Sequence, residues 1–155
     1  MDVLSDYISY LRDNRTELQA LYKDILINVT SFFREPESFE ALKAEIFPKL
    51  LSDRPSDSPL RIWVPGCSTG EEAYSVAMCA VEFLSDVKSK VGTQIFATDI
   101  SEPALEKARA GRYGEGEVRD VSAERLRRFF SKTEGDYLIN KSIREPVSYT
   151  HLTLP

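Results

Sequence analysis

Residues 63–75, which read WVPGCSTGEEAYS, constrain the fold of this chain more than any other stretch. Apolar residues alternate with others over 60–64, which predicts a strand, and apolar residues recur at helical spacing over 73–84, which predicts a helix. Gly66 and Gly70 let the backbone turn tightly between the two elements. The sequence therefore predicts a strand, a glycine-containing ligand loop and a helix.

The chemistry of this loop narrows the class of ligand. Glu71 and Glu72 fall in the first turn of the predicted helix, where they would repel a pyrophosphate and favour a cationic ligand. Ser68 and Thr69 each stand three residues before a glutamate, so either could form a capping box. An ordinary capped helix with acidic residues in its first turn is the alternative interpretation.

A second strand is predicted over residues 94–100, QIFATDI, and it ends in an acid. Strand, helix and strand at this spacing predict a right-handed unit with two parallel strands. Asp99 then lies at the carboxyl end of the second strand, where a carboxylate accepts hydrogen bonds from ribose hydroxyls in nucleotide-binding α/β folds. Its alternative role is to cap the next helix together with Ser101.

Further helices are predicted from the spacing of apolar residues. They are expected over 3–12 and 18–26, from Pro36 until Pro48 disrupts the helix, from Ser101 to Gly111, and after Ser122. In the last of these, three arginines are expected to form a solvated face: Arg125, Arg127 and Arg128. Residues 137–139 are expected to pair with 142–144 as a hairpin.

The segment 28–36, NVTSFFREP, fits neither a helical nor a strand period. It could be an ordinary connection in which Phe32 and Phe33 fill the core, or it could form part of a site.

Composition excludes several classes of protein. The net charge of −5 and the lack of a basic run argue against nucleic-acid binding, and no stretch of about 18 apolar residues predicts a membrane span. The N-terminus lacks the features of a signal peptide, so a cytoplasmic location is expected. One histidine, His151, and two cysteines without zinc-ligand spacing leave no material for a catalytic triad or a metal centre.

Three motifs in order resemble the chemotaxis-type protein-glutamate methyltransferases that use S-adenosylmethionine, the CheR family. They are residues 28–34 (NVTSFFR), 66–75 (GCSTGEEAYS), and 97–100 (ATDI) followed by 105–113 (LEKARAGRY). The resemblance implies an α/β, Rossmann-like methyltransferase fold behind a short helical lead-in. It covers most of the chain and is closest to the methyltransferase segment of multidomain chemotaxis hybrids, which implies fusion to esterase-like or sensory modules in the whole protein.

The resemblance also implies roles for individual residues. Asn28, Thr30 and Arg34 would lie beside the cofactor and the incoming side chain, with Arg34 as the catalytic residue. Glu72, in the loop that begins at Gly66, would bind the aminoacyl end of S-adenosylmethionine. Asp99 would bind its ribose. A cofactor that carries an ammonium and a sulfonium agrees with the cationic ligand that the acidic loop favours.

The expected reaction is methyl transfer to glutamate side chains of chemoreceptors or related signalling proteins. Glutamate is ionised at pH 7, with a pKa of about 4.3, so no general base and no histidine are needed. The alternative is a non-catalytic module that binds S-adenosylmethionine or docks to partners. A dinucleotide-dependent oxidoreductase is disfavoured by Glu71 and Glu72 and by the lack of G-x-G-x-x-G.

The last nine residues, VSYTHLTLP, do not match the family. They are the translation of GTC TCT TAT ACA CAT CTG ACG CTG CCG, which resembles the transposon-end adapter used in preparing sequencing libraries. We therefore expect a helical lead-in over 1–27, a partial methyltransferase domain over 28–146 and a non-native tail over 147–155. Such a chain would lack its later strands, leave an unpaired sheet edge and be inactive. A divergent native tail is the alternative.

Overall fold

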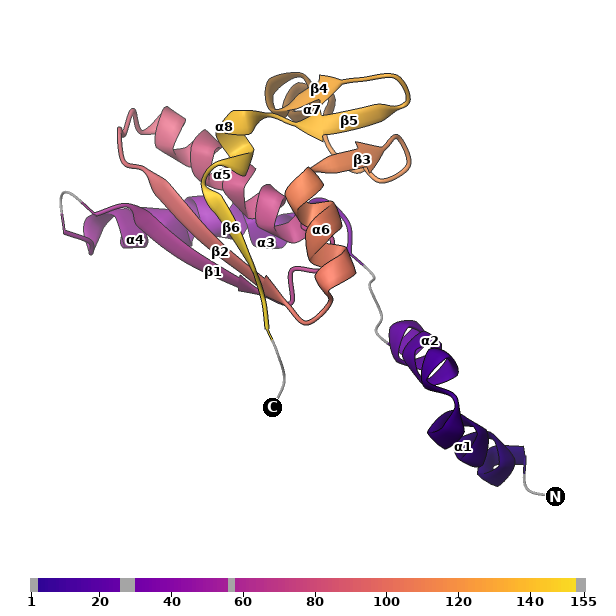
Figure 1. Cartoon of the computed structure of the whole chain (residues 1–155). Helices are drawn as coiled ribbons and strands as arrows, with labels where there is room; N and C mark the ends of the chain where they lie inside the picture. Colours follow the sequence, from indigo (N-terminus) through magenta and orange to yellow (C-terminus); the bar gives the residue numbers. More distant parts are fainter. Residues whose placement is uncertain (1–2, 26–29, 56–57, 153–155) are drawn as a thin grey trace.

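The computed structural model describes residues 3–25, 30–55 and 58–152. Helices and strands follow one another along the chain in a mixed α/β order (Figure 1). The elements are α1 Val3–Asp13, α2 Arg15–Ile25, α3 Pro36–Ala41, η1 Leu42–Ile46, α4 Phe47–Ser52, β1 Leu60–Pro65, α5 Glu71–Asp86, β2 Thr93–Asp99, α6 Glu102–Ala110, β3 Arg112–Gly114, α7 Ala123–Phe129, β4 Phe130–Lys132, β5 Asp136–Ile139, α8 Lys141–Arg144 and β6 Val147–His151.

A parallel sheet of order β1-β2-β6 carries the fold. Strands β1 and β2 pair in parallel, with Val64 opposite Ala97, and α5 connects them. The predicted strand, helix and strand are therefore confirmed. Alternate residues of these strands, such as Val64 and Ile95, are buried, whereas Trp63 is 65% exposed. Among the described residues, one face of this sheet thus forms the core and the other faces outward.

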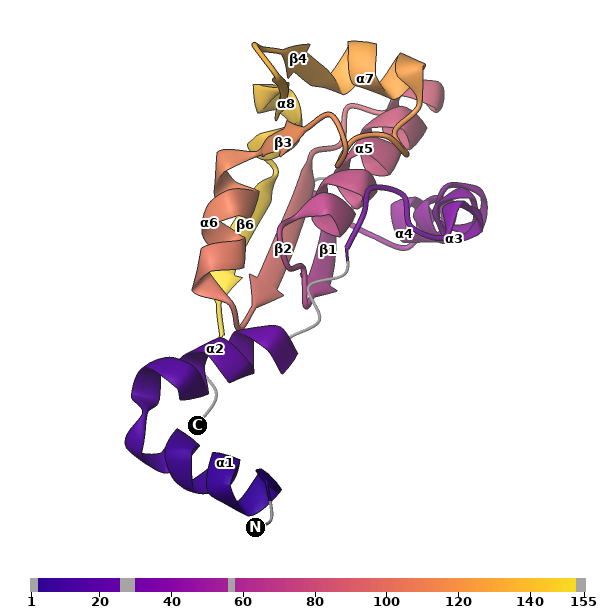
Figure 2. The same ribbon diagram turned by 90° about the vertical axis from the view of Figure 1, so that its right-hand side faces the viewer.

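Helix α5 is the centre of the core. Every residue from Ala73 to Ala80 is buried, because the helix packs against the sheet on one side and contacts α3, η1 and α8 elsewhere (Figure 2). Tyr74 and Met78 are almost completely enclosed. Burying one large apolar side chain contributes about 1.5–3 kcal/mol. The buried residues of α5 therefore stabilise the position of this helix and, with it, the position of the loop that directly precedes it.

A second, antiparallel sheet has the order β3-β5-β4. The hairpin expected between 137–139 and 142–144 is wrong. Strand β5 pairs with β3 on one edge and with β4 on the other, so both of its edges are occupied. The chain then turns into helix α8, whose Ile143 is completely buried.

The disruption expected at Pro48 takes the form of a π-helical turn rather than a helix end. In η1 the carbonyl of Leu42 accepts the N–H of Phe47, five residues on, and the chain continues as α4. The wider turn accommodates a proline, which has no N–H to donate to the helix ladder.

Residues 147–151, which begin the tail predicted to be non-native, form a strand. β6 pairs in parallel with β2, with Ala97 opposite Tyr149, and the carbonyl of Asp99 accepts the N–H of Leu152. Val147 turns inward and Ser148 outward, so the segment has the alternation that a strand at this edge requires. The sheet therefore ends at β6, whose outer edge pairs with no described strand. The adapter origin of the codons stays a prediction.

The two helices predicted from periodicity at the N-terminal end form as α1 and α2, which contact each other (Figure 1). The side chain of Asn14 accepts the N–H of Glu17 at 3.1 Å at the start of α2. Leu4, Ile8 and Leu18 are exposed on this pair. In the part of the chain that the structure describes, no helix has both the length and the apolar character needed to cross a bilayer.

Candidate functional site

The loop between β1 and α5 turns through three left-handed residues. Gly66, Ser68 and Gly70 have φ of 65°, 48° and 95°. A Cβ on Gly70 would lie 2.8 Å from the Cβ of Ala108, so glycine here serves both the backbone conformation and the close approach of α6. The left-handed Ser68 is an unfavourable conformation of the kind that clusters at binding sites.

Neither of the two expected capping boxes forms. Helix α5 begins after Gly70 without a side-chain cap, and the Thr69 hydroxyl donates to the Glu71 carboxylate at 2.7 Å instead. Gly70, in a left-handed conformation, occupies the N-cap position of α5, where a serine or threonine would supply a capping oxygen.

Asp99 ties the loop to the end of β2. Its carboxylate accepts the N–H of Ser68 at 2.7 Å and the N–H of Ser101 at 2.8 Å, and the Asp99 residue is only 9% exposed. Ser101 in turn accepts the N–H of Ala104 at the start of α6. Asp99 thus supports the start of α6 and is bound to the glycine loop. Its binding of ribose stays a prediction.

The segment 30–35 lies against this loop and is fixed by two buried aromatic rings. Phe32 packs edge-on against Tyr113, with ring centroids 4.9 Å apart, and Phe33 donates its N–H to the Ser75 hydroxyl of α5 at 3.0 Å. Phe33 and Glu35 have φ of 52° and 59°. The two phenylalanines thus fill the core, as one interpretation of the sequence expected, and they also hold the polar residues of the segment in place.

The two segments border a cavity of about 630 Å³, whose lining also includes residues of α3, η1 and α5. Four of the predicted site residues line it, namely Thr30, Arg34, Gly66 and Glu72. A cavity of this volume suits a ligand the size of a nucleoside derivative. Asn28 lies outside the described residues. Asp99 does not line the cavity itself but supports Ser68, which does.

The two adjacent glutamates face different surroundings, because neighbouring helical residues point in different directions. Glu72 is exposed and faces the cavity, whereas Glu71 is 3% exposed. Glu71 lines a second cavity of about 330 Å³ together with Thr69 and Lys107. Burial raises the pKa of Glu71 above its ordinary value, although the hydrogen bond from Thr69 opposes this.

The cysteine of the loop is not poised for nucleophilic chemistry. Burial and the charge of Asp99 raise the pKa of Cys67 to about 12, so the thiolate is not populated at neutral pH. Among the described residues, no group of three histidine, cysteine or acidic side chains could hold a metal ion. The lining instead offers a cation, Arg34, and an exposed carboxylate, Glu72, which suit a ligand that carries charges of both signs.

Two features of the site escaped sequence reasoning. Ser68 lines the cavity with its neighbours, and its polarity within the glycine loop was a signal for this. Arg125 was expected on a solvated face, but its side chain is 18% exposed and packs on Phe33. Helical periodicity could not reveal that contact, because it depends on tertiary packing between residues far apart in the sequence.

Comparison with known proteins agrees with this geometry. Residues 28–154 match the family model described as CheR methyltransferase, SAM binding domain. The chain is 37% identical over 151 residues to an uncharacterized 104.1 kDa protein of Rhodobacter capsulatus, covering 97% of this chain and 16% of that protein. It is 33% identical over 151 residues to chemotaxis protein methyltransferase 2 of Vibrio cholerae, covering 96% of this chain and 52% of that protein.

A third relative is chemotaxis protein methyltransferase 1 of Pseudomonas aeruginosa, which is 35% identical over 156 residues that cover 97% of this chain and 57% of that protein. The chain thus spans about half the length of these two methyltransferases and a sixth of the Rhodobacter protein.

Proposed function

This chain belongs to the CheR methyltransferase family, with S-adenosylmethionine as its cofactor, and from that premise we propose that the whole protein methylates glutamate side chains of chemoreceptors or related signalling proteins. The observation that carries the proposal is the shared cavity. Thr30 and Arg34 of the first segment, Gly66 of the glycine loop and Glu72 in the first turn of α5 all line it. The names of two relatives, which are chemotaxis protein methyltransferases, supply the process.

The residues of the cavity fit this cofactor by charge. The cofactor supplies, when bound, an electrophilic methyl group on a positively charged sulfur. Glu72 presents an exposed carboxylate that would pair with the ammonium of the aminoacyl end. Gly66 has open space where a Cβ would lie, so the backbone of the loop can approach the ligand closely. We further propose that Asn28 and Thr30 contact the cofactor from the other side.

Asp99 is proposed to bind the ribose. Each of its carboxylate oxygens accepts one backbone N–H and keeps capacity for another hydrogen bond. The same carboxylate therefore could fix the loop and bind a hydroxyl of the ligand.

The proposed reaction needs no general base. The acceptor glutamate is ionised at neutral pH, so its carboxylate oxygen can form the new bond to carbon while the carbon–sulfur bond breaks and its electron pair stays on sulfur. No proton moves. The task of the protein is then alignment of the two reactants, which can contribute about 7–11 kcal/mol to catalysis. Arg34 is proposed to guide and orient the acidic acceptor in the cavity.

Transfer of a labelled methyl group tests this proposal. The full-length protein is incubated with S-adenosylmethionine labelled in its methyl group and with receptor cytoplasmic fragments, and base-labile label on the fragment is counted. The proposal predicts label that disappears when the acceptor glutamates are changed to alanine. Label on other residue types would contradict the proposed acceptor.

A non-catalytic signalling module is the competing function, and the Rhodobacter relative is the observation that favours it. That protein has a mass of 104.1 kDa, of which this chain matches 16%, so a CheR-type segment can be a small part of a larger protein. Binding of S-adenosylmethionine without any transfer in the same assay would support the module. A cytoplasmic location and fusion to esterase-like or sensory modules are part of the proposal in either case.

A further inference from the structure

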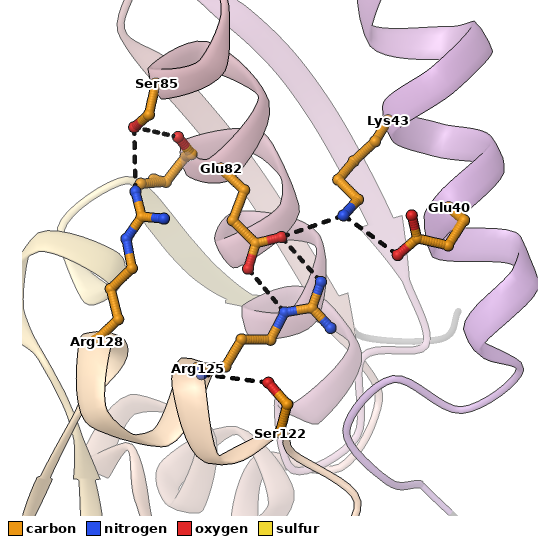
Figure 3. A network of polar contacts seen from close by, with 8 residues as sticks. Glu40, Lys43, Glu82, Ser85, Ser122, Arg125 and Arg128 are labelled. Atoms are coloured by element: carbon orange, nitrogen blue, oxygen red, sulfur yellow. Dashed lines mark hydrogen bonds and ion pairs between the residues drawn. The ribbon is translucent and has the colours of Figure 1, made fainter.

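A network of charged side chains joins η1, α5 and α7, and Glu40 of α3 extends it (Figure 3). Glu82 of α5 lies at its centre. Arg125 of α7 donates to Glu82 through two nitrogens, at 2.7 and 2.8 Å, and Lys43 of η1 contacts the same carboxylate at 3.4 Å. The side chains of Glu82 and Arg125 are 14% and 18% exposed. The pair is thus largely shielded from solvent, where an ion pair is worth more than on an open surface.

The guanidinium of Arg125 also covers the ring of Phe33. Its central carbon lies 3.9 Å from the ring centroid, a distance at which an arginine stacks on an aromatic face. The two hydrogen bonds to Glu82 fix the plane of the guanidinium, and that plane then covers one side of Phe33. Phe39 packs against the same ring, with centroids 5.3 Å apart.

Phe33 needs such support because its backbone is unfavourable. A φ of 52° is a conformation that bulky residues rarely adopt, and it persists only where the surrounding structure holds it. The turn at Phe33 brings the next residue, Arg34, to the cavity. Thr30, three residues before Phe33, lines the same cavity. The position of the Phe33 ring and the position of these two cavity residues are therefore linked through one turn of the backbone.

We propose that Arg125 is a positioning residue for the cofactor cavity, which acts by holding Phe33 in its left-handed conformation and thereby placing Thr30 and Arg34. This inference rests on the proposed function of the cavity. It gives the short α7, which directly precedes the antiparallel strand β4, a role in cofactor binding. Phe130 of β4 contacts the same segment at the neighbouring residue, because its ring packs edge-on against that of Phe32, with centroids 5.6 Å apart.

The charge network accounts for arginine at this position. A lysine would keep the positive charge but has neither a planar group to stack on Phe33 nor the fork that binds both oxygens of Glu82. Although burial raises the pKa of Glu82, the hydrogen bonds and charge of Arg125 lower it below the ordinary value, so the pair stays charged at neutral pH.

The experiment measures binding of S-adenosylmethionine by titration calorimetry, and thermal unfolding, in the full-length protein. Its variants are Arg125→Ala, Arg125→Lys, Phe33→Leu and the double variant of Arg125→Ala with Phe33→Leu. Arg127→Ala is the matched control, because Arg127 is exposed on the same helix and has no hydrogen bond or ion pair with any described residue. If Arg125→Ala does not fold, Glu82→Gln takes its place in the comparison, because this variant removes the charge that holds the Arg125 guanidinium.

We expect Arg125→Ala to weaken binding about fivefold or more, Arg125→Lys to weaken it nearly as much, and Arg127→Ala to leave it unchanged. Because Arg125 acts through Phe33, its substitution should have little further effect once Phe33 is leucine. The inference would be overturned if Arg125→Ala bound S-adenosylmethionine with wild-type affinity. It would also be overturned if Arg125→Ala weakened binding by the same factor in the wild-type and Phe33→Leu backgrounds. If the wild-type protein does not bind S-adenosylmethionine at all, the proposed function fails first, which is a distinct result.

Discussion

At the scale of single residues, Glu71 and Glu72 show that two adjacent, identical side chains can have different surroundings, one buried and one exposed. Glu72 faces the large cavity and is exposed, whereas Glu71 is enclosed next to Thr69. The sequence predicted two carboxylates at the helix start, and the resemblance pointed to Glu72 for the ligand. Nothing in the sequence predicted the burial of Glu71, because it depends on residues distant in the sequence, such as Tyr113, whose hydroxyl donates to the carbonyl of Thr69 at 2.7 Å.

Glu71→Gln should change how stability depends on pH. The pKa of Glu71 is raised in the folded protein, so the folded state favours the protonated carboxyl. The stability that this protonation contributes is fully present below the unfolded pKa of about 4.5. It is lost as pH rises through the folded pKa. Glutamine stays neutral and keeps an oxygen for the Thr69 hydroxyl. We therefore expect the variant to be more stable than wild type at pH 8 and equally stable at pH 4, as measured by denaturant unfolding.

A variant that loses stability equally at both pH values would contradict this explanation. Glu72→Gln is the matched control for the loss of one charge, since Glu72 is the neighbouring glutamate and is exposed.

Asp99→Ala should weaken binding of S-adenosylmethionine by about tenfold or more, which corresponds to about 1.4 kcal/mol. The substitution removes the proposed ribose acceptor and also the acceptor for the N–H of Ser68. Ser101→Ala is the control, because it removes the cap of α6 without touching the loop. Unchanged affinity in Asp99→Ala, measured by calorimetry on the full-length protein, would exclude the ribose role.

At the scale of elements, the βαβ unit could be predicted because its signals are local. Alternation over β1, two glycines and helical spacing in α5 all lie within one stretch of sequence. The antiparallel sheet could not be predicted in the same way. Strand β5 takes its partners from β3 and β4 on both sides, and helix α8 follows from the burial of Ile143 rather than from a strong local pattern.

The candidate site shows the same division. The motifs predicted the two segments that meet at the cavity, and the structure brings Thr30, Arg34, Gly66 and Glu72 together there. The contact of Arg125 with Phe33 was not predictable, because it depends on how α7 lies across α5.

Gly70→Ala tests the packing of the loop against α6. Alanine would have to adopt a φ of 95° and place its Cβ 2.8 Å from that of Ala108, so we expect a loss of about 3 kcal/mol in the free energy of unfolding. Gly116→Ala is the control, because a Cβ there meets nothing within 4 Å and the residue does not have a positive φ. Equal stability of the two variants in urea unfolding would show that the close approach at Gly70 is not important.

At the scale of the whole molecule, the parallel sheet has one covered face and one exposed face among the described residues. Trp63 and Phe96 are exposed on the second face, with the Arg61 guanidinium 5.2 Å from the Phe96 ring. Parallel sheets usually have both faces covered. The chain also spans only about half of the two chemotaxis methyltransferases it matches, so these side chains are the natural place to seek contacts with the rest of the protein.

The origin of residues 147–155 is a prediction that DNA sequencing can test. The locus is amplified from source DNA with primers outside the known ends, and the codons after Pro146 are read. We expect codons other than GTC TCT TAT ACA CAT CTG ACG CTG CCG. Finding those nine codons in the uninterrupted gene would show that the tail is native, and β6 would then be a natural strand of the sheet.

The central claim is that the cavity between segment 30–35 and the glycine loop binds S-adenosylmethionine through Glu72. Calorimetric titration of the full-length protein with S-adenosylmethionine, for wild type, Glu72→Gln and Glu37→Gln, tests it most directly. Glu37 is an exposed glutamate of α3 that does not line the cavity, so its variant controls for the loss of one charge. The account predicts wild-type affinity in Glu37→Gln and at least about tenfold weaker binding in Glu72→Gln. Equal affinity in all three proteins would contradict it.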